Sequence, residues 1–372
     1  MMGNDCLGIV FPNVHDDVMS EMTVRRSMGS VPFAARYRMI DFTLSLLVNA
    51  GISKVGVLAR ANYRSLMDHL GSGKSWDLDR KSGGLFILPP FAYGEGIYTG
   101  HIDALDSASD FIKHSTQKYV VLCDCDVVMN FPLEEMIERH IETGADVTVA
   151  YKHGTAPEGT KDITVFRFDR KGRAKDILIT GNVKGVCDHS LKVMVMEREK
   201  LLSFVADAVA HSQNSISRDI LQANIEELDI RGYRVETYAE VMTGMEAYVK
   251  ISNRLLSDRK ARDELFCHER PIFTKTRDDM PTKYGLKSSV SGCIIGDGCI
   301  IEGKVKNSVI FRGVHIAEGA VVENCIIMQD STVGENAEIR NVTLDKNVTV
   351  NANVTLCGSP VYPMYIRKGA TV

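Results

Sequence analysis

The sequence lacks the features that mark membrane-spanning, secreted and nucleic-acid-binding proteins. No run approaches the ~18 apolar residues of a membrane span, and no basic segment leads into a long apolar core near the N-terminus. The nine cysteines include no CxxC pair, which disfavours a zinc site and is typical of reduced thiols in the cytoplasm. The net charge of −4 gives no electrostatic reason to expect binding to nucleic acid or to an anionic membrane.

Glycine is missing from the turn that follows the first apolar segment. Residues 6–10 are predicted to form a short buried strand, and residues 11–17 follow with the sequence FPNVHDD. An α/β protein that binds a nucleotide usually places glycines here, so that backbone N–H groups can contact a phosphate. Instead, Pro12 has no N–H, and Asp16 and Asp17 would repel a triphosphate. The sequence therefore predicts a nucleotide-enzyme scaffold without its first phosphate contact.

Up to about residue 250, strand-like segments alternate with amphipathic helical segments. Residues 54–59 and 119–123 are mainly apolar, as in central parallel strands, and residues 133–143 have the apolar spacing of a helix. This alternation predicts an α/β fold with a doubly wound, mostly parallel, Rossmann-like sheet. Further expected elements are strands at 147–150 and 163–168, a hairpin turn at 169–172, and a closing helix at 245–257.

The pattern changes after Pro281, where branched apolar residues recur about every sixth position. The spacing shortens to five twice and widens to nine once, between Ile301 and Ile310. This period is typical of a left-handed parallel β-helix of hexapeptide repeats, whereas the alternative, a β-sandwich, would alternate with period two. The open end and flat faces of a β-helix predict oligomerisation. The repeating residues are Ile295, Ile301, Ile310, Ile316, Val322, Ile327, Val333, Ile339, Leu344, Val350 and Leu356.

Several long segments resemble one enzyme family. Residues 31–42 read VPFAARYRMIDF, which is similar to the VPFGGKYRIIDF segment of the ADP-glucose pyrophosphorylase (glucose-1-phosphate adenylyltransferase) family of bacterial glycogen synthesis. Ser45 and residues 49–52 continue this segment, and parts of residues 63–90 resemble a second family block. The resemblance covers essentially the whole chain. It implies a nucleotidyltransferase-like (GT-A-like) domain at 1–257, a linker at 258–285 and the β-helix domain at 286–372.

The chain departs from this family at the positions that bind the nucleotide. The family's glycine-rich GGxGxRL loop corresponds to residues 11–17, which offer neither the glycines nor the arginine. Its KP pair is replaced by Met28 and Gly29, and its GTADA segment reads GHIDA at residues 100–104. These departures imply that the contacts to the triphosphate are lost.

The metal-binding carboxylates are also incomplete. The family holds Mg²⁺ between two carboxylates, because the ion must bridge protein and phosphate oxygens while charge develops on the α-phosphoryl group. Asp124 or Asp126 matches the first carboxylate, with the alignment ambiguous. Residues 239–244 read AEVMTG where the family has an aspartate, and the nearby Glu240 is expected to point to the opposite face of the strand.

The sugar-phosphate contacts of the family are altered as well. Its glutamate–lysine loop corresponds to residues 176–181, which contain neither residue at that position. Its SMG turn corresponds to residues 190–192, where Lys192 replaces the glycine and is expected to enter the space of the glucose ring. Its DFGxDI segment reads NSISRDI at residues 214–220, which keeps Asp219. Losses at this many positions of one cleft imply an inactive site.

Together, the matches and the losses resemble the regulatory, GlgD-type subunit found beside a catalytic paralogue in many Gram-positive bacteria. This resemblance implies a cytoplasmic protein that assembles with the catalytic subunit, as a hetero-oligomer and most simply a heterotetramer, and raises its activity. The partner would join ATP and glucose 1-phosphate to give ADP-glucose and pyrophosphate. Mg²⁺ would be bound by the partner, and no cofactor is expected for this chain.

Four aspartates are the candidate residues of a vestigial cleft. Asp103, Asp124 and Asp126 are expected near the carboxyl ends of strands, where such sheets bind ligands, and Asp219 is kept from the family motif. The alternative role for the first three is to cap the helices that follow. Three histidines, at positions 15, 101 and 189, are isolated in the sequence and are interpreted as structural.

Four arginines form the densest basic cluster in the chain. Three of them, Arg25, Arg26 and Arg38, match basic residues that bind anionic effectors in the resembled family, and Arg36 lies between them. Guanidinium groups suit a sugar phosphate, so an effector site is one interpretation. The other is a solvated basic face.

Two further functions remain open from the sequence. The first is a weak but real adenylyltransferase that uses Asp124 or Asp126 for the metal and another backbone loop for the phosphates. The second is a homo-oligomeric sensor that binds a sugar phosphate without contacting a catalytic paralogue. The missing glycines and the missing second carboxylate disfavour the first, since positioning and electrostatics supply most of phosphoryl-transfer catalysis.

Overall fold

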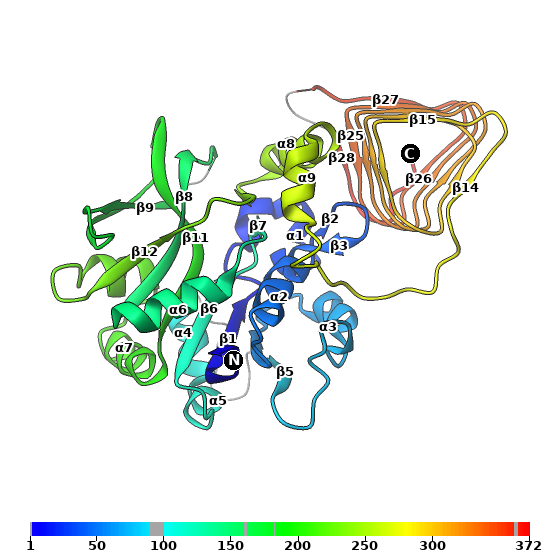
Figure 1. Ribbon diagram of the computed structural model, residues 1–372. Helices are drawn as coiled ribbons and strands as arrows, with labels where there is room; N and C mark the ends of the chain where they lie inside the picture. The colour runs from blue at the N-terminus through cyan, green and yellow to red at the C-terminus, as the bar shows by residue number, and fades with distance from the viewer. Residues whose placement is uncertain (1, 90–99, 160–161, 182, 361–363) are drawn as a thin grey trace.

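The computed structural model describes residues 2–89, 100–159, 162–181, 183–360 and 364–372. Figure 1 shows two parts, a domain of strands and helices that contains the N-terminus and a three-sided coil of strands that contains the C-terminus. Within the ranges given above, no helix combines the length and the apolar character needed to cross a lipid bilayer.

A nine-stranded sheet forms the centre of the N-terminal domain. Four neighbouring strands are parallel, in the order β6 (Tyr119–Asp124), β1 (Cys6–Phe11), β4 (Lys54–Leu58) and β5 (Gly84–Leu88). The expected strands at 6–10, 54–59 and 119–123 are therefore confirmed. Every residue of β1 and β6 is buried, as expected for parallel strands covered on both faces.

The long strand β11 (Val186–Glu197) joins the parallel strands to an antiparallel part of the sheet. It pairs with β8 (Val147–Thr155) along one edge and with β6 and β9 (Ile163–Phe168) along the other, and its register with β8 shifts between Ser190 and Met194. The hairpin turn expected at 169–172 is confirmed by the Gly172 N–H, which donates to the Asp169 carbonyl. The strands of this part are β8 (Val147–Thr155), β9 (Ile163–Phe168), β10 (Ala174–Thr180) and β12 (Ile230–Arg234).

Helices cover both faces of the sheet, which confirms the doubly wound α/β architecture. One face packs against α2 (Met39–Asn49), α3 (Arg64–Leu70) and α6 (Leu133–Thr143). The other packs against α4 (His101–Ser107), α5 (Ser109–Lys113) and α7 (Arg198–Ala210). The helix predicted at 133–143 is α6, and it buries Leu133, Met136 and Ile137 while its charged residues face outward.

A third apolar core connects the N-terminal domain to the coil of strands. In it, Met22, Phe42 and Tyr248 belong to the same cluster as Phe311 and Met328, which lie some 60 or more residues further along the chain. Figure 1 shows α8 and α9 at this junction. The elements at the junction are α1 (Ser20–Thr23), β2 (Pro32–Phe33), β3 (Tyr37–Arg38), β7 (Val127–Met129), β13 (Ala239–Val241), α8 (Met245–Ser257), which is the predicted closing helix, and α9 (Arg259–Leu265).

The C-terminal part is a β-helix of three five-stranded parallel sheets, which confirms the hexapeptide-repeat architecture. In Figure 1 it is seen along its axis as a stack of triangles. The first sheet contains β14 (Lys283–Tyr284), β17 (Ile300–Ile301), β20 (His315–Ile316), β23 (Thr332–Val333) and β26 (Thr349–Val350). The second contains β15 (Ser289–Ser291), β18 (Lys304–Lys306), β21 (Val321–Glu323), β24 (Glu338–Arg340) and β27 (Thr355–Cys357). The third contains β16 (Ile294–Ile295), β19 (Val309–Ile310), β22 (Ile326–Ile327), β25 (Val342–Leu344) and β28 (Met364–Ile366).

The coil length explains the irregular spacing in the sequence. Val305, Val322, Ile339 and Leu356 stand in register on successive strands, and their numbers differ by 17. A coil of 17 residues is one short of three hexapeptides, so one step in each of these coils contains five residues, whereas the coil from Ile301 to Ile316 has only 15 residues. The nine-residue gap between Ile301 and Ile310 contains Val305, which is buried inside the helix. The sequence interpretation had missed this residue.

One buried ion pair joins the two parts. Arg26, on the segment after α1, is 4% exposed, and its Nη2 lies 2.7 and 2.6 Å from the two carboxylate oxygens of Asp345, which follows β25. Tyr365 donates its hydroxyl to the same carboxylate at 2.7 Å. The domain boundaries 1–257, 258–285 and 286–372 stay a prediction. The structure places both α9 and β14 inside the expected linker.

Candidate functional site

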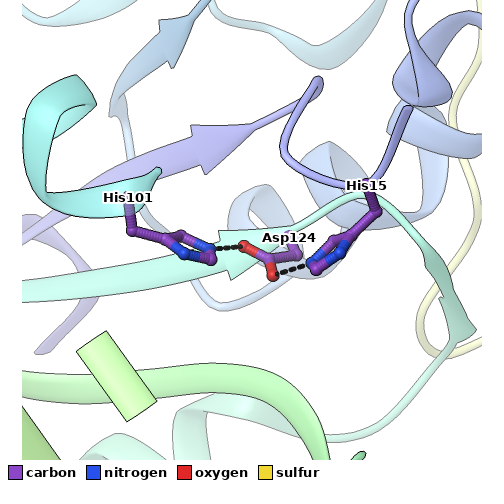
Figure 2. A group of neighbouring side chains, drawn as sticks. All are labelled: His15, His101 and Asp124. Atoms are coloured by element: carbon purple, nitrogen blue, oxygen red, sulfur yellow. Dashed lines mark hydrogen bonds and ion pairs between the residues drawn. The ribbon is translucent and has the colours of Figure 1, made fainter. Parts of the chain in front are cut away.

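The candidate site lies at the carboxyl ends of β1 and β6, where a doubly wound sheet binds its ligands. The turn after β1 contributes His15, the first turn of α4 contributes His101, and the last residue of β6 is Asp124. Figure 2 shows the two imidazoles pointing at the carboxylate from opposite sides. The sequence interpretation treated these histidines as isolated, whereas in the structure both contact the carboxylate of Asp124.

Asp124 accepts a hydrogen bond at each carboxylate oxygen. Its Oδ2 lies 2.8 Å from His15 Nε2, and its Oδ1 lies 2.9 Å from His101 Nε2. Burial alone raises the pKa of the Asp124 carboxyl, but the charge and the hydrogen bonds of His101 and His15 outweigh burial and hold that pKa well below its usual range. The Asp124 carboxylate is therefore ionised and enclosed by imidazoles.

Asp126 is paired with a lysine in the same cleft. Its side chain is 2% exposed, and its Oδ2 accepts a short hydrogen bond from Lys192 Nζ. That ammonium also lies 3.2 Å from His15 Nε2, so it connects the two aspartate sites. The second carboxylate oxygen, Asp126 Oδ1, is buried and has no hydrogen-bond partner among the residues that the structure describes.

Lys192 reaches the cleft from a backbone conformation that favours glycine. It stands where the register of β11 shifts, with a φ of 57°, and its N–H donates to Ser190 Oγ at 3.0 Å. A non-glycine residue in the left-handed region costs roughly 1 kcal/mol. Lys192 was expected to enter the cleft, and in the structure its ammonium extends into the cleft and pairs with Asp126.

The glycine-free turn is held by side chains instead of a phosphate. Asn13 Nδ2 donates to Asp16 Oδ2 at 2.9 Å, and the Met28 N–H donates to Asp16 Oδ1 at 2.6 Å. Burial raises the pKa of Asp16 to about 6, although these hydrogen bonds act in the opposite direction. The turn continues into a short 3-10 helix, Asp16–Met19. The Asn13 amide and the Met28 N–H are thus occupied by the Asp16 carboxylate.

The space beside this turn is small. A cavity of only about 10 Å³ lies between Phe11, Asn13, Arg60 and Gly100, in the described part of the chain. This volume is close to the minimum for a single water molecule. The His101 ring packs edge-on against Phe11, with ring centroids 4.8 Å apart.

Residues 239–244, where the resembled family has its second carboxylate, include Met242. This side chain is fully buried, and its backbone N–H donates to the Asp126 carbonyl at 2.7 Å. Glu240 pairs with Arg254 of α8. A separate cavity of about 610 Å³ lies beside β13 and α8, and its lining includes Lys152, His189, Glu240 and Arg254.

These residues do not fit Mg²⁺. The ion requires oxygen ligands in octahedral geometry and usually keeps several waters. Both Asp124 oxygens bond to imidazoles, and Asp126 is paired with an ammonium. The nearby carboxylate of residues 239–244, Glu240, pairs with Arg254.

Two of the candidate aspartates lie at the edge of the cleft with structural partners. Asp219 Oδ2 accepts the N–H groups of Asn214 and Ser215 at 3.0 and 2.9 Å, which holds the turn before the π-helix Ile216–Gln222. The amide of Asn214, oriented to donate, lies 3.0 Å from Asp103 Oδ1. Asp103 and Asp219 thus both contact Asn214, and neither takes part in the contacts that connect Asp124 with Asp126.

The structure does not bring the three candidate effector arginines together as free cations. The Arg26 guanidinium is held by Asp345, and Arg38 Nη1 donates to the Ser65 carbonyl at 2.6 Å. Arg25 is exposed. Next to Asp345, burial and then the positive charges of Arg38 and Arg26 together lower the pKa of Lys346 to about 6.

Comparison with known families matches both parts of the chain. Residues 19–177 match the nucleotidyl transferase family, and residues 280–360 match the family described as GlmU-like, C-terminal hexapeptide. The glycogen biosynthesis protein GlgD of Bacillus subtilis (strain 168) is 32% identical over 372 residues, which span 99% of this chain and 97% of that protein. The chain belongs to the GlgD family.

Two other relatives are a second GlgD protein and an enzyme. GlgD of Geobacillus stearothermophilus is 36% identical over 323 residues, 86% of this chain and 84% of that protein. Glucose-1-phosphate adenylyltransferase of Bacillus thuringiensis (strain Al Hakam) is 26% identical over 347 residues, 90% of each chain. The resemblance to the adenylyltransferase family is thus confirmed at the level of the whole chain.

Sequence reasoning missed the pairing of His15 and His101 in this GlgD-family chain. The two residues are 86 positions apart, and neither belongs to a spaced metal motif. A signal was available, because the histidines lie in residues 11–17 and 100–104, the two segments that depart from the nucleotide-binding motifs of the resembled family. Two departures of the same residue type in one cleft indicate a shared role.

Proposed function

We propose that this chain is a non-catalytic or weakly active regulatory subunit of glucose-1-phosphate adenylyltransferase in glycogen biosynthesis. It would assemble with a catalytic paralogue and increase the rate at which that subunit makes ADP-glucose from ATP and glucose 1-phosphate. The names and the lengths of the GlgD relatives support the pathway, and the hexapeptide β-helix supports an oligomer.

One observation carries the non-catalytic part of this proposal. The carboxylates that would hold the catalytic Mg²⁺ are bound by protein side chains, Asp126 by the Lys192 ammonium and Asp124 by the imidazoles of His15 and His101. A phosphoryl-transfer enzyme needs those carboxylates for the metal, because the metal neutralises the charge of the transferring group. The chain itself therefore needs no cofactor in this role, and Mg²⁺ would act in the partner.

The decisive experiment compares the chain alone with the chain mixed with its catalytic paralogue. We expect the chain alone to form no ADP-glucose above background, and the mixture to form it faster than the paralogue alone. Native mass spectrometry of the mixture should give a single hetero-oligomer, with a heterotetramer as the simplest composition. Strong turnover by the chain alone would contradict the proposal, as would failure of the two proteins to co-assemble.

A homo-oligomeric sugar-phosphate sensor is the second candidate. The cavity of about 610 Å³ favours it, because Lys152 and His189 line a volume that is large enough for a sugar phosphate. Binding of glucose 1-phosphate to the chain alone, measured by calorimetry and lost in Lys152→Met, would support this function. Co-assembly with activation of the paralogue would favour the regulatory subunit instead.

An anionic effector near Arg25, Arg26 and Arg38 also stays a proposal. Arg26 already neutralises Asp345, so Arg25→Ala tests the site without breaking the junction between the two parts of the chain. A reduced activation of the assembled enzyme by sugar phosphates or phosphate would support the effector site. Unchanged activation would remove it.

A further inference from the structure

The cluster of His15, His101 and Asp124 has the composition of a transition-metal site. Each residue offers one ligand atom, and the three atoms lie within 4.8 Å of one another. They come from the turn after β1, from α4 and from the end of β6, so the central sheet and a helix packed on it fix their relative positions. Figure 2 shows both imidazole edges directed at one carboxylate.

The donor atoms select the class of ion. Imidazole nitrogens with a carboxylate are typical ligands of Zn²⁺, Co²⁺ and Ni²⁺, whereas Mg²⁺ and Ca²⁺ prefer oxygen ligands alone. Around a tetrahedral ion with bonds of about 2.1 Å, neighbouring ligand atoms stand roughly 3.4 Å apart. His15 and His101 lie 2.8 and 2.9 Å from different oxygens of Asp124, so an ion that enters between the rings and the carboxylate would widen these separations by about half an ångström.

Asp126 supplies the second, independent observation. Its Oδ1 is buried and lacks a hydrogen-bond partner within the described ranges, which is costly for a carboxylate oxygen. Its Oδ2 lies 3.9 Å from His15 Nε2, within the reach of a common ion. Asp126 thus lies beside the three-residue cluster and can supply a fourth ligand through Oδ2 once the Lys192 ammonium moves away.

Lys192 stands where it would compete with the ion. Its ammonium contacts both Asp126 and His15, and its side chain is 23% exposed, so it can swing out to solvent. The side chains of His15 and His101 are 23% and 21% exposed, which leaves the cluster accessible from the cleft.

We propose that His15, His101, Asp124 and Asp126 bind one divalent transition-metal ion of the zinc class, in competition with the Lys192 ammonium. The ion would hold the turn after β1, α4 and the end of β6 together, in the place where the enzymes of the wider family bind a nucleotide and Mg²⁺. This site is independent of the regulatory role proposed above, since it depends only on residues of this chain.

The test uses the untagged full-length chain after removal of metals with a chelator. Titration with Co²⁺, followed by its visible absorption, should show one ion per chain in a tetrahedral nitrogen–oxygen environment, and added Zn²⁺ should displace it. Mg²⁺ should neither displace Co²⁺ nor give heat in calorimetry. Zn²⁺ should also raise the melting temperature of the chain.

Variants assign the ligands. His101→Asn should weaken Co²⁺ binding by more than about 100-fold, since it removes a direct ligand. Lys192→Met should tighten binding by about tenfold, because the ion no longer has to displace an ammonium. His153→Asn is the matched control, since His153 is a half-exposed histidine that pairs with Asp188 outside the cluster.

Three results would overturn the site. The first is the absence of stoichiometric Co²⁺ uptake, and the second is uptake that is equal in the wild type and in folded His101→Asn. The third is a sulfur-to-cobalt charge-transfer band, which would indicate binding at cysteines such as the exposed Cys357. If His101→Asn does not fold, His15→Asn makes the same test, with circular dichroism as the check on folding.

Discussion

At the residue scale, Lys192 shows how one substitution occupies a cleft. A glycine at this position would adopt the left-handed backbone without strain and would leave Asp126 open. Lysine incurs a conformational cost and brings a cation that pairs with a buried carboxylate. The gain from the pair exceeds the strain, because an unpaired carboxylate in that position would be far more costly.

This balance predicts the stability of Lys192→Gly. Loss of the pair should cost about 3 kcal/mol, of which relief of the left-handed backbone returns about 1 kcal/mol. Urea unfolding of the metal-free protein should therefore show a net loss of about 2 kcal/mol. Lys192→Ala, which keeps the strain, should lose about 1 kcal/mol more. Adding Asp126→Asn to Lys192→Gly should restore much of the stability. A Lys192→Gly protein as stable as the wild type would contradict this account.

At the element scale, the corners of the β-helix depend on asparagines in the left-handed conformation. Asn307, Asn324 and Asn341 have φ values of 46°, 53° and 53° and follow one another at 17-residue intervals, one per coil. Asn324 Nδ2 lies 3.4 Å from Asn341 Oδ1, and Asn341 Nδ2 donates to the Gly358 carbonyl at 3.2 Å. The ladder links adjacent coils.

Replacing Asn341 separates backbone strain from these side-chain contacts. Asn341→Gly loses only the ladder contacts, whereas Asn341→Ala also places a Cβ in the left-handed region. We expect the alanine variant to be less stable than the glycine variant by about 1 kcal/mol in urea unfolding. Equal stability of the two variants would mean that the corner has relaxed to another conformation.

The elements differ in how far the sequence predicts them. The helix at 133–143 and the apolar spacing after Pro281 were readable, because both depend on local periodicity. Val305 was missed because its coil is shortened to 15 residues, from Ile301 to Ile316, so Val305 follows Ile301 after four residues instead of six. The His15–Asp124 and His101–Asp124 contacts were out of reach, since they join residues 109 and 23 positions apart and depend on the order of strands in the sheet.

At the scale of the whole molecule, the junction between the sheet domain and the β-helix concentrates charge. Lys346 lies near the cations Arg38, Arg26 and Lys368, and the carboxylate of Asp345 partly offsets their charge. The low pKa of Lys346, about 6, follows from burial first and from these cations second.

This pKa predicts a pH dependence of stability. Lysine in the unfolded chain titrates near 10.5, so between about pH 6 and pH 10 the unfolded state binds more protons than the folded state. The free energy of unfolding should therefore rise with pH in this window, by at most about 1.4 kcal/mol per unit from this group. Lys346→Met should lose this contribution and be more stable than the wild type at pH 7. Identical pH profiles for the two proteins in urea unfolding would contradict the assignment.

The Arg26 ion pair has a mechanical consequence. Residues 15–28 form one short segment with His15 at one end and Arg26 near the other. Two hydrogen bonds hold this segment together: Thr23 Oγ1 donates to the Asp16 carbonyl, and the Met28 N–H donates to the Asp16 carboxylate. A rotation of the β-helix against the sheet must either break the Arg26–Asp345 ion pair or move residues 15–28. Movement of this segment would shift the imidazole of His15 relative to Asp124. A protein bound to the β-helix could therefore change the geometry of the cleft.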